Sequence, residues 1–119
     1  MGDRANINVR DSGDDNGVFL YTYWRGSIIP FILQQALCKR QRWDDCPYLT
    51  RIIFDTLSQG HNGEEDGFGI SSFMGDSNYE GILQVDVNSQ TVEATGSGKI
   101  WTFEEYINLD REELLENWN

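Results

Sequence analysis

The sequence predicts one α+β domain: a mainly antiparallel sheet, a central pair of antiparallel helices, and short helices towards the C-terminal end. Three observations predict it: a hairpin-like N-terminal segment, two stretches with apolar residues at helical spacing, and three later strand-like runs. The 119 residues are enough for one core and too few for two. We therefore expect a single domain over 1–119.

The N-terminal hairpin is predicted from two strand-like runs around a turn. Residues 5–10 alternate apolar and polar side chains, as a half-buried strand does. Residues 11–17 are rich in turn formers, and strand-like composition resumes over 18–25. In the second strand, alternation places Leu20, Thr22 and Trp24 on one face, which we expect to cover the helices.

Two helices are expected between the hairpin and the later strands. Ser27 is a candidate N-cap for the first, with Pro30 in its first turn. The second is expected to begin at Asp44 or Asp45, whose side chains can cap it, and to stop near Gly60. The short connection between them favours antiparallel packing.

The later part of the chain predicts three strands and two short helices. The strands are expected at 68–74, 82–88 and 91–95. Two capping-box patterns follow, one pairing Thr102 with Glu105 and the other pairing Asp110 with Glu113. Each box predicts the start of one short helix.

The net charge of −11 comes entirely from the second half of the chain. Residues 1–59 carry seven basic and seven acidic side chains, whereas 60–119 carry two basic and thirteen acidic ones. Such a field repels nucleic acids and anionic membranes, so we expect neither as a direct partner. The chain has no membrane-length apolar run and begins with polar residues unlike a signal peptide, so we expect a cytoplasmic protein.

The metal-ligating and thiol residues are few. Cys38 and Cys46 are expected to be reduced and packed, with a bridge across the connecting loop left open as an alternative. The single histidine, His61, is distant in sequence from both, so we expect no zinc site and no cofactor.

Two glycine-rich segments resemble ligand loops but lack the decisive residues. TGSGK, at 95–99, has Glu93 in place of the first glycine of a phosphate loop and Ile100 in place of its final Ser or Thr, which predicts a hairpin loop. DSNYEG, at 76–81, begins like a calcium loop but places Val87 at the twelfth position. A turn is favoured there, with weak calcium binding as the alternative.

No arrangement of residues indicates catalysis. The carboxylates form no distinctive pair, and the serines lack the glycines of a nucleophile elbow. The sequence therefore favours a binding protein over an enzyme, with no catalytic residue assigned.

Two short motifs are similar to those of a known group of proteins: RAN at residues 4–6 and LYTYWRG at residues 20–26. Together with GISS at 69–72 and DSNY at 76–79, they make the chain resemble a group of small, mostly uncharacterised bacterial and phage proteins. That group follows an Arg-Ala-Asn strand with Leu-Tyr-x-His-Trp-x-Gly. This chain has Tyr23 where the group has histidine, so the resemblance implies that any chemistry of that histidine is missing here.

The first functional hypothesis is a small-ligand site on the tyrosine face of the second strand. Alternation places Phe19 and the candidate residues on one face, beside an arginine of the first strand. The candidates are Tyr21, Tyr23, Arg25, Arg4 and Arg10. Aromatic rings beside guanidinium groups suit a nucleotide, with its base stacked and its phosphate paired. In its most specific form, this hypothesis describes a phage anti-defence protein that sequesters a nucleotide immune signal.

Two alternatives remain open. The acidic half could act as an inhibitor, either by imitating a nucleic acid or by blocking a basic surface of a host protein. Alternatively, the exposed aromatic strand could pair with its copy in a homo-oligomer. The tyrosines would then be covered by packing.

Overall fold

Six strands form one sheet in the order β3-β2-β1-β4-β5-β6 in the computed structural model, which describes residues 2–11, 16–116 and 118–119. Their bounds are β1 Ala5–Arg10, β2 Val18–Thr22, β3 Phe68–Ser71, β4 Leu83–Asp86, β5 Thr91–Ala94 and β6 Lys99–Thr102. Neighbouring strands are antiparallel except β1 and β4, which run parallel. The mainly antiparallel sheet is confirmed, and β6 is a strand beyond the three expected in the later part of the chain.

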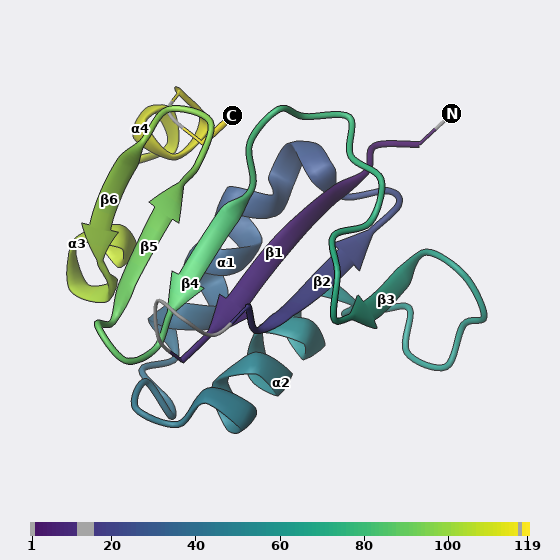
Figure 1. Cartoon of the computed structure of the whole chain (residues 1–119), viewed down its shortest axis with the longest axis horizontal. Helices are drawn as coiled ribbons and strands as arrows, with labels where there is room; N and C mark the ends of the chain where they lie inside the picture. The colour runs from purple at the N-terminus through teal and green to yellow at the C-terminus, as the bar shows by residue number, and fades with distance from the viewer. Residues whose placement is uncertain (1, 12–15, 117) are drawn as a thin grey trace.

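The two longer helices cover one face of the sheet. In Figure 1, α1 (Ile29–Cys38) lies behind the strands and α2 (Cys46–Leu57) lies below them. The short helices α3 (Phe103–Ile107) and α4 (Arg111–Glu116) pack on α1 near β6. The α+β class is confirmed. Within the described residues, no helix has both the length and the apolar character that crossing a membrane requires.

One apolar core lies between the sheet and the helices. Leu20 and Thr22 of β2 are fully buried in it, as alternation predicts. The other completely buried core side chains come from both layers: Ala5, Ile7, Ile29, Leu33, Leu37, Leu49, Ile53, Leu57, Leu83, Val85, Val92 and Ala94. This helix-covered face leaves the opposite face of the sheet for other contacts.

Strand β1 is buried on both faces, whereas the sequence predicted a half-buried strand. Asn6 and Asn8, which point away from the helices, are 0% and 1% exposed. The Asn8 amide donates to the carbonyls of Asn16 and Val18 and accepts from Gln84, so its polar atoms are satisfied without water. The polar face of β1 is covered by other segments of the chain, since Asn6 bonds to Gly75 and Asn8 bonds to Asn16.

The helix starts follow the predicted caps in all but one case. Asp45 caps α2, its carboxylate accepting from the backbone N–H of Tyr48. Both capping boxes form, with the Thr102 hydroxyl and the Asp110 carboxylate each accepting from the third residue of its helix. Ser27 is not an N-cap, because a 3₁₀ turn over Gly26–Ile28 precedes α1 and contains it. Its N–H instead donates to Asp3.

The remaining predictions for this part of the chain concern a helix end, a turn and the thiols. Helix α2 ends at Leu57, earlier than the predicted stop at Gly60. The turn expected at 11–17 falls mostly outside the described residues. Cys38 and Cys46 are not joined by a disulfide bond, and Cys38 is exposed rather than packed.

The two glycine-rich segments both connect strands of the sheet. TGSGK makes the turn between β5 and β6, closed by a bond from the Gly98 N–H to the Ala94 carbonyl, so the hairpin prediction is confirmed. DSNYEG lies in the connection from β3 to β4. Across the described residues, no group of three or more His, Cys, Asp or Glu side chains could hold a metal ion.

Candidate ligand-binding site

Thr22 ends the β2 strand and redirects the residues that follow it. Its hydroxyl accepts hydrogen bonds from the backbone N–H groups of Trp24 and Arg25, a local bond pattern that competes with strand pairing. Strand alternation therefore stops at Thr22. Trp24 is 47% exposed, not in the core, so the prediction that it covers the helices is wrong.

Arg25 is engaged with the end of α2, away from the tyrosine face. Its guanidinium donates to the carbonyl of Leu57 at 3.0 Å and to that of Gln59 at 2.9 Å. The Leu57 carbonyl is one of the unpaired acceptors at the C-terminal end of α2, and Gln59 lies two residues beyond that end, where a positive charge is also favourable. In this structure Arg25 acts as a helix cap contributed by another part of the chain.

Arg10 lies at the opposite end of β1 from the tyrosines. It pairs with Asp86 of β4, with 3.6 Å between its Nε and the carboxylate, whereas Tyr21 is aligned with Asn6. Arg10 is therefore separated from Tyr21 along the strand, and Arg25 is turned to the end of α2.

Arg4 does lie beside the tyrosines. Its guanidinium carbon is 5.9 Å from the centre of the Tyr23 ring, and Nη1 is 3.6 Å from the Asp76 carboxylate. Its Nε also donates to the amide oxygen of Asn78 at 3.4 Å. Because the Asp76 side chain is 86% exposed, solvent screens this ion pair and the pair contributes little to stability.

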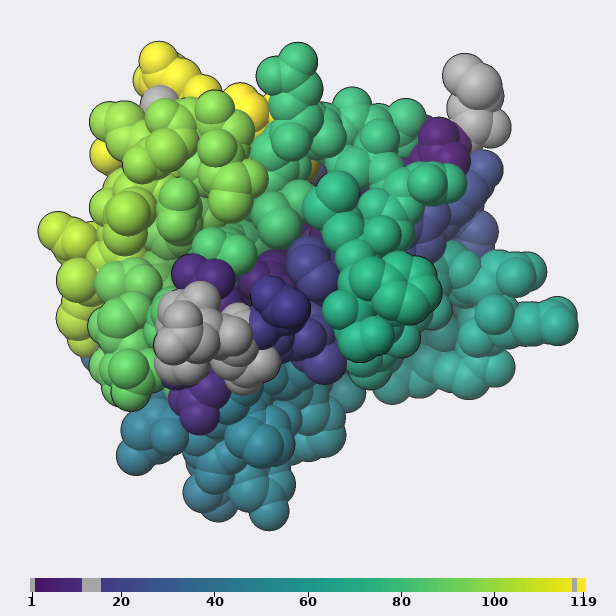
Figure 2. Space-filling view, viewed as in Figure 1, coloured from purple at the N-terminus to yellow at the C-terminus, as the bar shows by residue number. Residues whose placement is uncertain are grey.

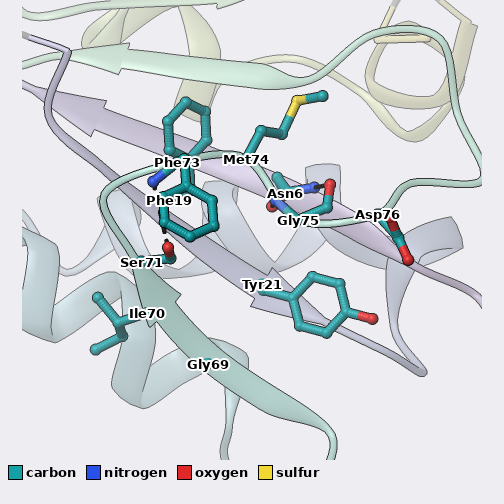
Figure 3. Close-up of a pocket in the computed structure, with 10 residues that line it drawn as sticks. All are labelled: Asn6, Phe19, Tyr21, Gly69, Ile70, Ser71, Phe73, Met74, Gly75 and Asp76. Atoms are coloured by element: carbon teal, nitrogen blue, oxygen red, sulfur yellow. Dashed lines mark hydrogen bonds between the residues drawn. The ribbon is translucent and has the colours of Figure 1, made fainter.

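A hollow of about 450 Å³ opens beside Tyr21 on the face of the sheet that lacks helices. Its floor is β2 and β3, and its wall is the segment that follows β3 (Figure 3). The space-filling view of this face shows that segment bordering the residues of β2 (Figure 2). The lining is Asn6, Phe19, Tyr21, Gly69, Ile70, Ser71, Phe73, Met74, Gly75 and Asp76. Three aromatic rings and a few polar groups are the usual lining of a small-molecule site.

The wall of the hollow is fixed by one buried amide. The Asn6 side chain donates to the Gly75 carbonyl at 3.1 Å and accepts from the Gly75 N–H at 3.0 Å, imitating the pairing of two strands. A Cβ at residue 75 would lie 2.9 Å from a ring carbon of Tyr21, so glycine allows this close approach. Ser71 steadies the same segment by accepting from the N–H of Phe73.

A second hollow, of about 440 Å³, is also lined by Tyr21. It is lined by Tyr21, Tyr23, Trp24, Asp66 and Gly67. Tyr21 is thus the ring that both hollows share. Arg4, which lies over Tyr23, is next to this second hollow.

The electrostatics around Tyr21 keep its phenol protonated. Burial raises its pKa, and the carboxylate of Asp76 adds to the rise although the guanidinium of Arg4 opposes it. Its hydroxyl makes no hydrogen bond with the part of the chain that the structure describes. It can therefore donate to, or accept from, a bound molecule.

The structure thus brings together three of the five candidate residues, Arg4, Tyr21 and Tyr23, and separates Arg10 and Arg25 from them. The sequence analysis missed Phe73 and Met74 as wall residues, because it extended the strand through 68–74. Strand β3 ends at Ser71, and the chain then folds over the sheet. The serines at 71–72 and the Gly-Asp-Ser-Asn run at 75–78 were the available indication of that loop.

Comparisons with protein-family models, with curated proteins and with solved structures found no match for this chain. The resemblance carried by RAN and LYTYWRG therefore stays an expectation, and the geometry of the hollows is the basis for a functional proposal.

Proposed function

We propose that this protein binds a small planar molecule, of the class of a nucleobase or nucleotide, in the hollow beside Tyr21. The observation that carries the proposal is that Tyr21 lines two hollows and shares one of them with Phe19 and Phe73. A planar ring stacked on these side chains gains about 1–3 kcal/mol for each base–aromatic contact. Figure 3 shows the three rings around the hollow.

The polar groups at the rim suit the edge of such a ring. The Asp76 carboxylate can accept from an exocyclic amine, and the Tyr21 hydroxyl can donate to a ring nitrogen or carbonyl. The Asn6 amide is already bonded to Gly75. It therefore positions the wall of the hollow and is not free to hydrogen-bond to a ligand. Recognition therefore depends on Tyr21 and Asp76.

Arg4 is the group that would take an anionic substituent such as a phosphate. It lies over Tyr23, and its partner Asp76 is largely exposed, so a phosphate can replace that carboxylate without leaving a buried charge unpaired. The specific role proposed for such binding is sequestration of a nucleotide signal, which requires tight binding and no catalytic group.

The test is binding of nucleobases, nucleosides, and linear and cyclic nucleotides, measured by calorimetry on the wild type and on two matched variants. Phe73→Ala removes a ring that is 73% exposed at the hollow, and Ile100→Ala removes an apolar side chain that is 61% exposed on β6. Neither is a core residue. We expect Phe73→Ala to weaken binding about tenfold or more and Ile100→Ala to leave it unchanged. If none of these compounds binds, the proposal is wrong.

A further inference from the structure

A separate hollow, of about 310 Å³, lies where three segments distant in sequence meet. The segments are the link between α1 and α2, the turn between β4 and β5, and the junction of β6 with α3. The lining is Trp43, Ser89, Gln90, Thr102, Phe103 and Glu104, and none of these residues lines either hollow beside Tyr21. The volume is near the lower end of the roughly 300–1,000 Å³ of small-molecule sites, which suits one ring-sized unit.

The aromatic ring of this hollow is fixed by contacts with all three segments. The indole N–H of Trp43 donates to the Leu37 carbonyl at 3.1 Å, and the ring meets Phe103 edge-on, with 5.3 Å between the ring centres. The Gln90 side chain donates to the Trp43 carbonyl at 3.4 Å, and the Phe103 N–H donates to the Gln90 carbonyl at 2.9 Å. A ligand that packs on Trp43 therefore meets a ring that is already positioned.

The backbone conformation singles out the same place. Among the described residues, the non-glycine residues with positive φ are Arg40, Arg42 and Gln90, at 53°, 58° and 55°. Arg40 lies over the Trp43 ring, Arg42 precedes Trp43 in the chain, and Gln90 lines the hollow. Glycine or asparagine usually occupies such positions at helix ends and in hairpin turns, because other side chains are strained there. Backbone strain of this kind is common at functional sites.

Gln90 is the residue of these three whose side chain the hollow leaves available. Its amide group makes the one 3.4 Å bond to Trp43, and its amide oxygen accepts no hydrogen bond from the part of the chain that the structure describes. Arg40 is engaged with Glu104, and Arg42 lies over the Tyr48 ring, 4.7 Å from its centre. The oxygen of Gln90 can therefore accept a hydrogen bond from a bound molecule.

The charges at the hollow are already balanced. The Glu104 carboxylate accepts from both terminal nitrogens of the Arg40 guanidinium, one of them at 2.9 Å, and this pairing lowers the pKa of Glu104. The other polar side chains, Ser89, Gln90 and Thr102, are neutral. An anionic or a cationic ligand thus finds no unpaired opposite charge. A sugar ring fits better, because its hydroxyls donate to such oxygens and its C–H face packs on an aromatic ring.

We propose that this hollow binds a neutral polyhydroxy ring, of the class of a monosaccharide unit, packed against Trp43. One hydroxyl of the ring donates to the amide oxygen of Gln90, and another donates to the carboxylate of Glu104. Arg40 holds that carboxylate in place from the rim.

The experiment is an NMR titration of the whole protein with glucose, galactose, mannose and N-acetylglucosamine. The resonances followed are the indole N–H of Trp43 and the side-chain amide of Gln90. We expect at least one sugar to shift both resonances to saturation. Glucose 6-phosphate and glucosamine, which carry a charge, should bind no more tightly than glucose. If no sugar shifts these resonances, or if a charged compound binds more tightly than every neutral sugar, the proposal is overturned.

Two glycine variants form a matched pair, because each replaces a residue that has positive φ. Gln90→Gly removes a side chain from the hollow, whereas Arg42→Gly removes one that lies over Tyr48. Since glycine adopts this conformation freely, both variants should fold, with thermal unfolding midpoints close to that of the wild type. Sugar binding should weaken at least about tenfold in Gln90→Gly and stay unchanged in Arg42→Gly.

Sugar binding that survives Gln90→Gly would also overturn the assignment. Phe73→Ala, which changes the hollow beside Tyr21, should leave sugar binding unchanged, and Gln90→Gly should leave nucleotide binding unchanged. The two sites are therefore tested independently.

Discussion

The side-chain amide of Asn6 and the main chain of Gly75 are joined by two hydrogen bonds, at 3.1 and 3.0 Å, although 69 residues separate them in the chain. This pair connects the central strand to the wall of the hollow beside Tyr21. Because Asn6 is completely buried, neither bond can be replaced by solvent without a rearrangement.

Asn6→Ala should therefore loosen the wall and destabilise the fold. We expect a loss of about 1–3 kcal/mol in the free energy of unfolding, since the polar main chain of Gly75 is left unpaired. Urea denaturation measures the loss, and faster amide exchange at Gly75 locates it. Asn108→Ala, which removes one exposed bond to Glu104, is the control and should cost less than about 0.5 kcal/mol. Equal losses for the two variants would contradict this role of Asn6.

Arg25 is predicted to matter for stability and not for ligand binding. Arg25→Ala removes two charge-assisted bonds to the end of α2 and should cost about 1–3 kcal/mol. Arg51→Ala breaks only an exposed pair with Asp55 and should cost about 0.5 kcal/mol or less. Chemical denaturation compares the two. A variant at Arg25 with unchanged stability and weakened ligand binding would reverse the assignment.

Alanine is predicted to destabilise the fold more at Gly67 than at Gly63, although both glycines have positive φ, at 98° and 84°. Alanine at either position costs about 1–2 kcal/mol from the backbone alone. At residue 67 the added Cβ would also lie 2.1 Å from the Trp24 ring, whereas at residue 63 it meets nothing within 4 Å. Gly67→Ala should thus lose about 1–3 kcal/mol more than Gly63→Ala. Thermal unfolding, with Trp24 fluorescence as the local readout, checks the difference.

Tyr79 is predicted to make stability depend on pH in alkaline solution. Burial and its hydrogen bond to Asp3 raise the pKa of Tyr79 to about 12, above the ordinary value of 10.0. The folded protein therefore holds this proton more tightly than the unfolded chain does. The contribution is complete below pH 10 and is lost as the pH rises through about 12.

Tyr79→Phe tests this assignment. It should cost about 1 kcal/mol at neutral pH, and the difference from the wild type should shrink between pH 10 and 12. Tyr48→Phe removes a hydroxyl from a ring that is 51% exposed and should leave the pH profile unchanged. Urea denaturation as a function of pH is the measurement. Parallel profiles for the wild type and Tyr79→Phe would refute the prediction.

Much of the fold follows from local patterns. Apolar alternation along β1 and β2, the Asp45 cap and both C-terminal capping boxes each depend on residues a few positions apart, so the sequence alone predicts them. The same holds for the β5–β6 turn, in which Gly98 takes the positive φ that hairpin turns favour. Strand β6 was missed because Lys99–Thr102 is short and largely exposed, with little alternation to reveal it.

The site was only partly predictable, because it depends on contacts distant in sequence. Composition and alternation placed Tyr21 and its neighbours on a face without helices. Only the tertiary structure decided that Thr22 ends the strand, that Arg25 turns to the end of α2, and that Asn6 binds the segment with Phe73 over the sheet. Sequence periodicity reports which face a side chain occupies, but the packing of distant segments determines which partner it meets.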